Sequence, residues 1–136
     1  MAIEVERKFL VRGEAWRNGV VRARRIRQGY LAREDGVTVR LRVSGRVGAP
    51  VGQDRAMLTV KGPGLLQRHE YEYPVPVAQA QEMLDLLCTG RCLDKTRHDV
   101  PHGALVWEVD VFEGPLAGLV LAEVELPDAA HPLDLP

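Results

Sequence analysis

The chain has 136 residues, with 18 Lys and Arg against 19 Asp and Glu, and 46% of its residues are apolar. This length and composition fit one globular domain and exclude a disordered or fibrous chain. A net charge of −1 argues against a nucleic-acid partner, and no apolar run reaches the roughly 18 residues of a membrane span. The charged start, MAIEVERKF, is no signal peptide, and two cysteines are too few for a disulfide scaffold, so we expect a cytoplasmic protein with no membrane partner.

Eight segments alternate apolar and polar residues with the period of two that is typical of β-strands. In the first, residues 2–11, the side chains of Glu4, Glu6 and Lys8 share one face. The other strands are expected at residues 22–31, 37–44, 56–61, 67–73, 92–100, 104–112 and 119–126. Eight strands in a chain this short favour an antiparallel sheet or a closed barrel.

One segment has the periodicity of a helix instead. Over residues 77–88, the side chains of Val77, Ala80 and Leu84 fall on one stripe. A second, short helix is compatible with residues 14–18. Residues 44–55 are rich in glycine and lack periodicity, which predicts a mobile loop.

Like charges recur two residues apart on the same face of six strands. The pairs are Glu4/Glu6, Arg40/Arg42, Glu70/Glu72, Lys95/Arg97, Glu108/Asp110 and Glu123/Glu125. A solvated polar face explains any one of them, but like charges repel at this spacing, so six pairs indicate separate acidic and basic regions. Clustered carboxylates suit Mg²⁺ or Mn²⁺, and clustered Arg and Lys suit a polyphosphate. The charged face is therefore expected to line a barrel lumen that is wide enough for a ligand.

These motifs also carry a resemblance to a known family. The segment EVERK, with Glu4, Glu6 and Lys8, matches the E-x-E-x-K signature of the CYTH superfamily, the triphosphate tunnel metalloenzymes. It is followed in the family's order by RQGYL, VRLR, LTVKG, EYEY, DKTRH, WEVDVF and AEVEL. Over residues 2–126 the chain resembles the short bacterial members, most of which are inorganic tripolyphosphatases. Those members usually continue with segments that are not found before Pro136, so we expect a single tunnel domain over residues 1–136 that lacks this C-terminal part.

The resemblance implies a mainly β (α+β) fold, an eight-stranded antiparallel closed barrel with a polar lumen and a few helices outside. It implies Mg²⁺- or Mn²⁺-dependent hydrolysis of inorganic tripolyphosphate to pyrophosphate and phosphate. The implied metal ligands are Glu4, Glu6, Asp110, Glu123 and Glu125. The implied phosphate-binding residues are Lys8, Arg40, Arg42, Lys61, Lys95 and Arg97, and Glu70 or Glu72 would brace them or a second metal. Glu4, Glu6, Lys8 and Lys95 would take part in catalysis, with Tyr30 closing or lining one end of the tunnel.

Other functions remain open at this point. Class IV adenylate cyclases, which make cyclic AMP from ATP, and thiamine triphosphatases are relatives in the same superfamily. A non-catalytic polyphosphate-binding module would keep the basic residues, and a structural β-domain would leave the charged face merely solvated. The sequence also allows a homodimer.

The basic run in the second strand allows two explanations. Arg22 and Arg25 are expected at a solvated strand edge, whereas either Arg24 or Arg27 is a candidate for the mouth of the tunnel.

Overall fold

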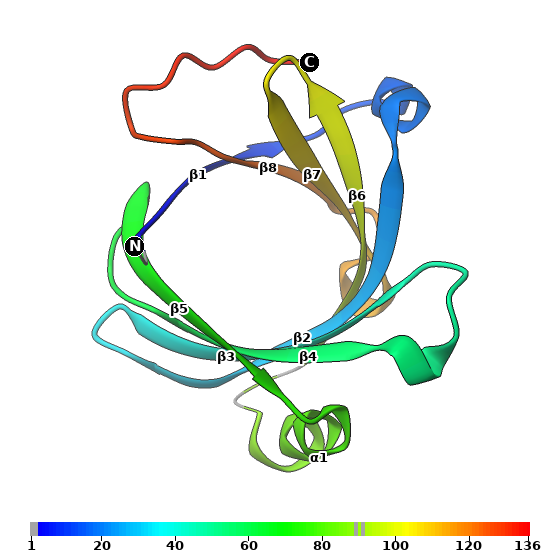
Figure 1. Ribbon diagram of the computed structural model, residues 1–136, viewed down its shortest axis with the longest axis vertical. Helices are drawn as coiled ribbons and strands as arrows, with labels where there is room; N and C mark the ends of the chain where they lie inside the picture. The colour runs from blue at the N-terminus through cyan, green and yellow to red at the C-terminus, as the bar shows by residue number, and fades with distance from the viewer. Residues whose placement is uncertain (1–2, 89, 91) are drawn as a thin grey trace.

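Eight strands close into one antiparallel barrel in a computed structural model that describes residues 3–88, 90 and 92–136 (Figure 1). The strands are β1 (Ile3–Leu10), β2 (Arg22–Glu34), β3 (Val37–Arg46), β4 (Arg55–Lys61), β5 (Gln67–Val75), β6 (Leu93–His102), β7 (Leu105–Phe112) and β8 (Val120–Glu125). Their order around the barrel is β1-β5-β4-β3-β2-β6-β7-β8, and β8 pairs with β1. The predicted fold class, a closed eight-stranded antiparallel barrel, is confirmed.

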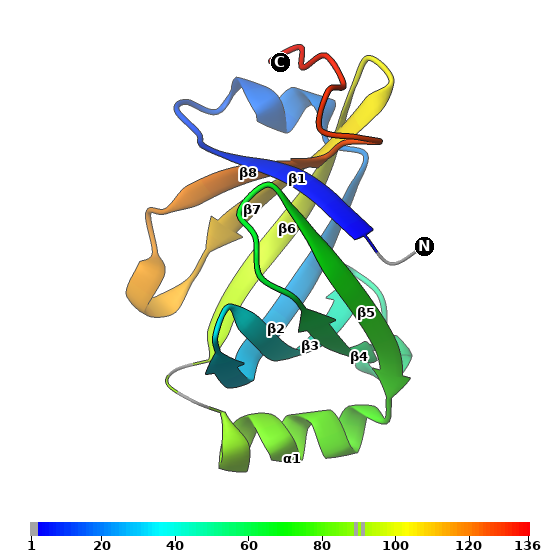
Figure 2. The ribbon, with the colours of Figure 1, turned by 90° about the vertical axis from the view of Figure 1, so that its left-hand side faces the viewer.

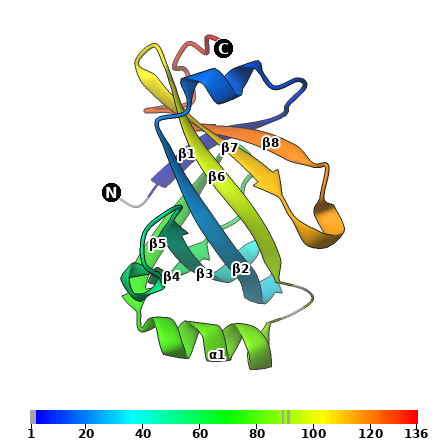
Figure 3. The same ribbon diagram turned by 90° about the vertical axis from the view of Figure 1, so that its right-hand side faces the viewer.

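The helical elements lie outside the barrel wall. They are α1 (Val77–Leu87) and the 3-10 helices η1 (Ala15–Gly19), η2 (Val51–Gln53) and η3 (Gly114–Leu116). Figures 2 and 3 show α1 lying across one end of the molecule, while η1 and the C-terminal segment lie at the other. Among the residues that the structure describes, no helix has the length and apolarity that a membrane crossing requires.

The loop between β3 and β4 is shorter and better anchored than the sequence indicates. The predicted loop over residues 44–55 loses its first three residues to β3 and its last to β4. What remains is tied to β2, because the Val47 N–H donates to the Ala23 carbonyl at 3.0 Å and Asp54 pairs with Arg25 at 3.6 Å. The prediction of a mobile loop therefore overlooked contacts that form only when β2 and β3 are paired.

Apolar side chains point outward from the barrel and are covered by the segments outside it. On the β3 and β4 side, α1 lays Ala80 and Leu84 against Leu41, Val43 and Ala56, and all five are buried. Burial of such side chains stabilises the fold by about 1.5–3 kcal/mol for each large one. Because successive residues in a strand face opposite sides, this outer packing directs the intervening charged residues into the lumen.

A second apolar cluster covers the opposite side of the barrel. Its buried members are Val5, Val100, Trp107, Val109, Ala122, Val124 and Leu126. Trp16 of η1 and Leu133 of the C-terminal segment pack against it. The barrel therefore has two outer cores and a charged interior, the reverse of a barrel that is filled with apolar side chains.

Gly29 of β2 lets the end of α1 approach the barrel closely. A Cβ atom at this position would lie 2.3 Å from the Cys88 Sγ and 3.1 Å from a methyl group of Leu84. Only glycine leaves room for this contact, which explains the glycine in the RQGYL motif.

β1 forms pairings of unequal length on its two edges, and one of them joins the two ends of the chain. β1 pairs with β8 over five residue pairs, from Glu6↔Glu125 to Leu10↔Leu121. On its other edge β1 pairs with β5 over three, from Ile3↔His69 to Val5↔Gln67. The β1–β5 joint is thus the shortest pairing in the ring that the structure describes.

Candidate active site

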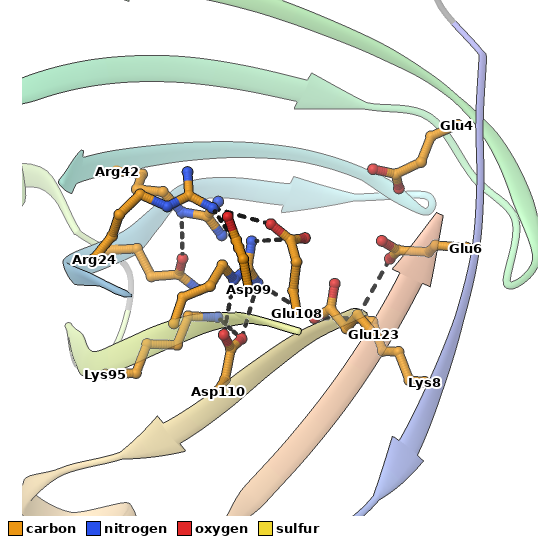
Figure 4. Close-up of polar contacts among 12 residues, drawn as sticks. Glu4, Glu6, Lys8, Arg24, Arg42, Lys95, Asp99, Glu108, Asp110 and Glu123 are labelled. Carbon is orange, nitrogen blue, oxygen red and sulfur yellow. Dashed lines mark hydrogen bonds and ion pairs between the residues drawn. The ribbon is translucent and has the colours of Figure 1, made fainter. Parts of the chain in front are cut away.

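The lumen is a strongly charged cavity of about 380 Å³. Its lining contains seven acidic residues, Glu4, Glu6, Glu70, Glu72, Glu108, Glu123 and Glu125. It contains eight basic residues, Lys8, Arg24, Arg40, Arg42, Lys61, Arg68, Lys95 and Arg97. Gln28, Tyr30, Leu93, Phe112 and Leu121 complete the lining. The charged face of the predicted strands therefore points inward, where these residues lie close together (Figure 4).

The two signs of charge occupy different walls. All the acidic residues come from four strands that are consecutive around the barrel, in the order β5-β1-β8-β7. Five of the basic residues come from β2, β3 and β6 on the other side. Figure 4 shows Arg42, Arg24 and Lys95 on one side of the cavity and Glu4 and Glu6 on the other. A ligand that carries both a cation and a chain of anions can therefore contact both walls at once.

Glu4 is the most heavily bonded carboxylate of the acidic wall. It accepts hydrogen bonds from the Lys61 Nζ at 2.9 and 3.1 Å, and the Arg68 Nε lies 3.5 Å away. Burial by itself would raise the pKa of Glu4, but hydrogen bonds from Glu70 and Lys61 outweigh it and lower the pKa. Burial and the neighbouring Glu4 raise the pKa of Glu70 to about 7. In the hydrogen bond between Glu4 and Glu70, the proton therefore resides on Glu70.

Glu6, Lys8, Glu123 and Glu125 meet where β1 pairs with β8. Glu6 lies opposite Glu125, and Lys8 lies opposite Glu123. The Lys8 Nζ is 3.6 Å from Glu6 and 4.0 Å from Glu123, and its side chain is half exposed. Burial, followed by the charges of Glu4, Glu108 and Glu6, raises the pKa of Glu125. Glu6 also pairs with Arg68 at 3.4 Å and Glu123 with Arg97 at 3.7 Å, whereas Glu125 has no cation within ion-pair distance among the described residues.

Asp110 lies behind the basic wall as an anchor for two cations. Its Oδ1 accepts a hydrogen bond from the Arg97 Nε at 2.8 Å, and its Oδ2 accepts bonds from the Arg97 Nη2 at 2.8 Å and the Lys95 Nζ at 2.6 Å. All three side chains are buried. Burial would raise the pKa of Asp110, but Arg97 and Lys95 together hold the pKa below its usual range.

The pKa values of Lys95 and Arg97 are shifted in opposite directions by this environment. Burial, followed by repulsion from Arg97, lowers the pKa of Lys95 to about 8. Burial would also lower the pKa of Arg97, but the bonds and charge of Asp110 raise it well above its usual range. Of these two cations, Lys95 therefore loses its proton more readily as the pH rises.

Arg40 and Arg42 are the residues of the basic wall whose positive charge is least neutralised by nearby carboxylates. The Arg42 Nε donates to the amide oxygen of Gln28 at 2.9 Å. Arg40 donates to Thr59 at 3.4 Å, and the Thr59 hydroxyl donates to Glu72 at 3.2 Å. Neither arginine is ion-paired to a carboxylate among the residues that the structure describes. Burial, followed by repulsion from Arg40 and Arg97, lowers the pKa of Arg42 to about 9.

The comparisons with known proteins agree with this geometry. The sequence profile of the CYTH domain matches residues 2–135. The chain belongs to the CYTH domain family. It is 40% identical over 129 residues to an inorganic triphosphatase from Acetivibrio thermocellus, which covers 94% of this chain and 77% of the relative. It is 41% identical over 125 residues to an inorganic triphosphatase from Nitrosomonas europaea, which covers 90% and 75%.

The fold of the CYTH chain is also found in a solved relative. A structure of an inorganic triphosphatase matches it with a TM-score of 0.60 at 35% identity, over 93% of this chain and 75% of that chain. The family resemblance inferred from the motifs is thereby confirmed.

The CYTH lumen brings together nearly all the residues that the sequence singled out. Glu4, Glu6, Lys8, Tyr30, Arg40, Arg42, Lys61, Glu70, Glu72, Lys95, Arg97, Glu123 and Glu125 all line the cavity. Asp110 is the exception: it is 1% exposed and is bonded to Lys95 and Arg97. Tyr30 also stacks under the Arg33 guanidinium, 3.8 Å from the ring centre. Of the two candidates in the basic run, Arg24 lines the lumen, while Arg27 contacts Gln81 and Asp85 of α1 outside it.

Three polar lining residues were not assigned a role from the sequence, namely Gln28, Arg68 and Glu108. Each lies two positions from an assigned residue in the same strand, for example Arg68 from Glu70. Strict alternation along each strand would therefore have found them. Arg22, expected at a solvated edge, pairs instead with the buried Asp99 at 3.0 Å.

CYTH triphosphate tunnel metalloenzymes depend on a metal ion, and the donor set of this lumen fits a hard divalent cation. Glu4, Glu6, Glu123 and Glu125 supply carboxylate oxygens from two paired strands. Burial, followed by the charges of Glu4, Glu108 and Glu6, raises the pKa of Glu125. In the part of the chain that the structure describes, no three His, Cys, Asp or Glu side chains already converge as a metal-ligand group. The acidic residues turn toward Lys61, Lys8 and Arg68 instead, so a cation would exchange these partners for itself.

Proposed function

We propose that this protein is a metal-dependent inorganic triphosphatase that hydrolyses tripolyphosphate to pyrophosphate and phosphate in the lumen. The observation that carries the proposal is the pair Arg40 and Arg42, which line the cavity without a carboxylate partner among the described residues. A buried guanidinium without an anion is costly, and a phosphate chain supplies the anion in the geometry that arginine prefers. Both curated relatives are inorganic triphosphatases, which supports this substrate over thiamine triphosphate or ATP.

The basic wall would bind the phosphates. Arg40 and Arg42 on β3 and Lys95 and Arg97 on β6 flank β2, so a chain of phosphates in the lumen has cations on both sides. Lys61 on β4 would join them once a ligand draws Glu4 away from it. Phosphoryl transfer depends mainly on positioning and electrostatic stabilisation, and fixed cations provide both without rearrangement during the reaction.

The acidic wall would hold the metal ion, Mg²⁺ or Mn²⁺. Glu4, Glu6, Glu123 and Glu125 are the residues that we propose as its ligands. When bound, such an ion neutralises phosphate oxygens and lowers the pKa of a bound water. Lys8, which lies beside Glu6 and Glu123 and is half exposed, is placed to donate to a phosphate oxygen at the entrance of the lumen.

For Asp110 we propose a role other than the metal-ligand role that the resemblance implied. Both of its oxygens accept hydrogen bonds from Arg97 or Lys95. We propose that it positions these two cations against the substrate. Glu72, which acts on Arg40 through Thr59, is a second positioning residue.

The test is phosphate release from tripolyphosphate, ATP and thiamine triphosphate in Mg²⁺ or Mn²⁺. We expect release from tripolyphosphate, and a loss of about 100-fold or more in Glu4→Gln. Glu82→Gln, on the exposed face of α1, is the matched control and should retain full activity. Removal of the metal with EDTA should abolish release and restoration of the metal should recover it.

Three results would overturn the proposal. Cyclic AMP formed from ATP without phosphate release would favour the cyclase, and preferential release from thiamine triphosphate would favour that substrate. Tight binding of tripolyphosphate without turnover in either metal would favour a binding module. We propose that the reaction takes place in the cytoplasm, without a nucleic-acid or membrane partner.

A further inference from the structure

A second hollow lies beside the lumen where β2 begins and β3 ends. Its volume is about 480 Å³, and its lining consists of Arg22, Arg24, Ser44, Gly45, Arg46, Gln53, Arg55, Asp99 and Glu108. Arg24 and Glu108 also line the lumen. The two spaces therefore share part of their wall and lie side by side. We call this second hollow the mouth site.

Positive charge exceeds negative charge in the mouth site. Four arginines, Arg22, Arg24, Arg46 and Arg55, face two carboxylates, Asp99 and Glu108. Asp99 pairs with the Arg22 Nε at 3.0 Å and with Arg24 at 3.6 Å. Glu108 pairs with Arg24 at 3.0 Å and with Arg97 of the lumen at 3.4 Å.

The remaining two arginines are left without compensation. Arg46 and Arg55 have no carboxylate within ion-pair distance among the residues that the structure describes. Both side chains are exposed, so their unpaired charges reduce the stability of the free protein only slightly. The same exposure makes them available to a ligand.

Strand pairing adds to the unfavourable charge. Arg24 and Arg46 are directly opposite one another across β2 and β3. Like charges at this position repel and destabilise a strand pair. In addition, the Arg24 Nε is buried without a hydrogen-bond acceptor. One oxygen of Asp99, a residue that is only 6% exposed, is buried without a hydrogen-bond donor. An anion between Arg24 and Arg46 would relieve the repulsion and supply the missing acceptor.

The segment that carries Arg46 and Arg55 is fastened to β2 rather than loose. Asp54, next to Arg55, pairs with Arg25 at 3.6 Å, and the Val47 N–H, next to Arg46, donates to the Ala23 carbonyl at 3.0 Å. These contacts fix the backbone on both sides of the loop, so that Arg46 and Arg55 are placed at the edge of the hollow before a ligand arrives.

We infer that the mouth site binds one phosphate group beyond those held in the lumen. The inference rests on the proposed function in one respect, namely that the lumen itself binds triphosphate. The extra group is either the terminal phosphate of a linear chain longer than three or a free inorganic phosphate. Arg24, Arg46 and Arg55 contact it, and Asp99 positions Arg24.

The test is calorimetric titration in EDTA, so that binding is measured without hydrolysis. The ligands are linear triphosphate, linear tetraphosphate, and inorganic phosphate added to protein that is already saturated with triphosphate. The variant is Arg46→Ala/Arg55→Ala. The matched control is Arg12→Ala/Arg17→Ala, which removes the same charge from exposed positions in and beside η1.

For a terminal phosphate, we expect tetraphosphate to bind about tenfold more tightly than triphosphate to the wild type and the control, and equally to Arg46→Ala/Arg55→Ala. For a free phosphate, we expect saturable phosphate binding in the wild type and the control that is lost in the same variant. Equal behaviour of the wild type and Arg46→Ala/Arg55→Ala with both probes overturns the inference, as does an equal loss in the control. Failure of the wild type to release phosphate from triphosphate would overturn the proposed function alone, because these titrations require no turnover.

Discussion

Arg97 and Asp110 face one another directly across β6 and β7 and are joined by two hydrogen bonds of 2.8 Å. The same carboxylate holds Lys95 at 2.6 Å. One buried anion thus fixes two of the cations of the basic wall, and it does so from inside the barrel wall. Asp110 therefore both stabilises the fold and positions two of the cations that would contact an anionic ligand.

Asp110→Asn should destabilise the ligand-free protein by about 3–5 kcal/mol, because it leaves Lys95 and Arg97 buried without an anion. Urea unfolding measures the change. Added triphosphate should recover part of the loss, since its charge substitutes for the missing carboxylate. The control is Asp85→Asn, which removes an exposed ion pair with Arg27 and should cost no more than about 1 kcal/mol. A loss in Asp110→Asn as small as that of the control would contradict this account.

Arg42→Met should have opposite effects on stability and binding. The substitution removes a buried, uncompensated charge, so the unfolding free energy of the ligand-free protein should stay level or rise. Affinity for triphosphate should fall about 100-fold, because a charge-assisted contact to the phosphates is lost. Urea unfolding and calorimetric titration measure the two effects, with Arg12→Met as an exposed control. A strong destabilisation would show that Arg42 is compensated in the free protein.

Glu70 should make the stability of the ligand-free protein depend on pH. Burial and Glu4 raise its pKa from 4.5 to about 7, so the folded state retains a proton that the unfolded state has lost. The stabilisation is therefore complete below about pH 4.5 and is lost as the pH rises to about 7. The difference in unfolding free energy between wild type and Glu70→Gln, measured in EDTA, should fall across this window. Glu82→Gln should follow the wild type at every pH, and a flat difference for Glu70→Gln would refute the assignment.

Gly29→Ala should loosen the contact between β2 and α1. The added Cβ would lie 2.3 Å from the Cys88 Sγ, so the end of the helix must shift, at a cost of about 1–3 kcal/mol. Thermal unfolding measures the change. Gly52→Ala is the control, because nothing lies within 4 Å of its added Cβ, and it should unfold like the wild type. Equal midpoints for the two variants would show that α1 adapts without strain.

Alternation along single strands predicted the strands and which charged residues share a face, and the family resemblance decided between an open sheet and a closed barrel. The pair Glu4 and Glu6 and the pair Arg40 and Arg42 are examples, because a period of two places both members of a pair on one face. The limits of this reasoning appear at Glu108 and Asp110. They share a face, yet Glu108 lines the cavity and Asp110 is buried beneath cations.

What separates such residues is pairing between strands that are distant in sequence. Asp110 owes its position to its alignment with Arg97, and Arg24 owes its charge conflict to its alignment with Arg46. The register of these pairs depends on turns and outer packing together, so no local pattern reveals it. No pattern within a single strand predicts the mouth site either, because its arginines come from three different strands, β2, β3 and β4.

The pairing of β1 with β8 has a consequence for synthesis of the protein on the ribosome. Glu6 and Glu125 are direct partners across this joint, although they lie near opposite ends of the chain. The ring cannot close until β8 has left the ribosome, so a nascent chain that lacks it exposes unpaired strand edges. The acidic wall is therefore completed last. A chain that is interrupted before residue 123 lacks Glu123 and Glu125 and cannot form the closed lumen.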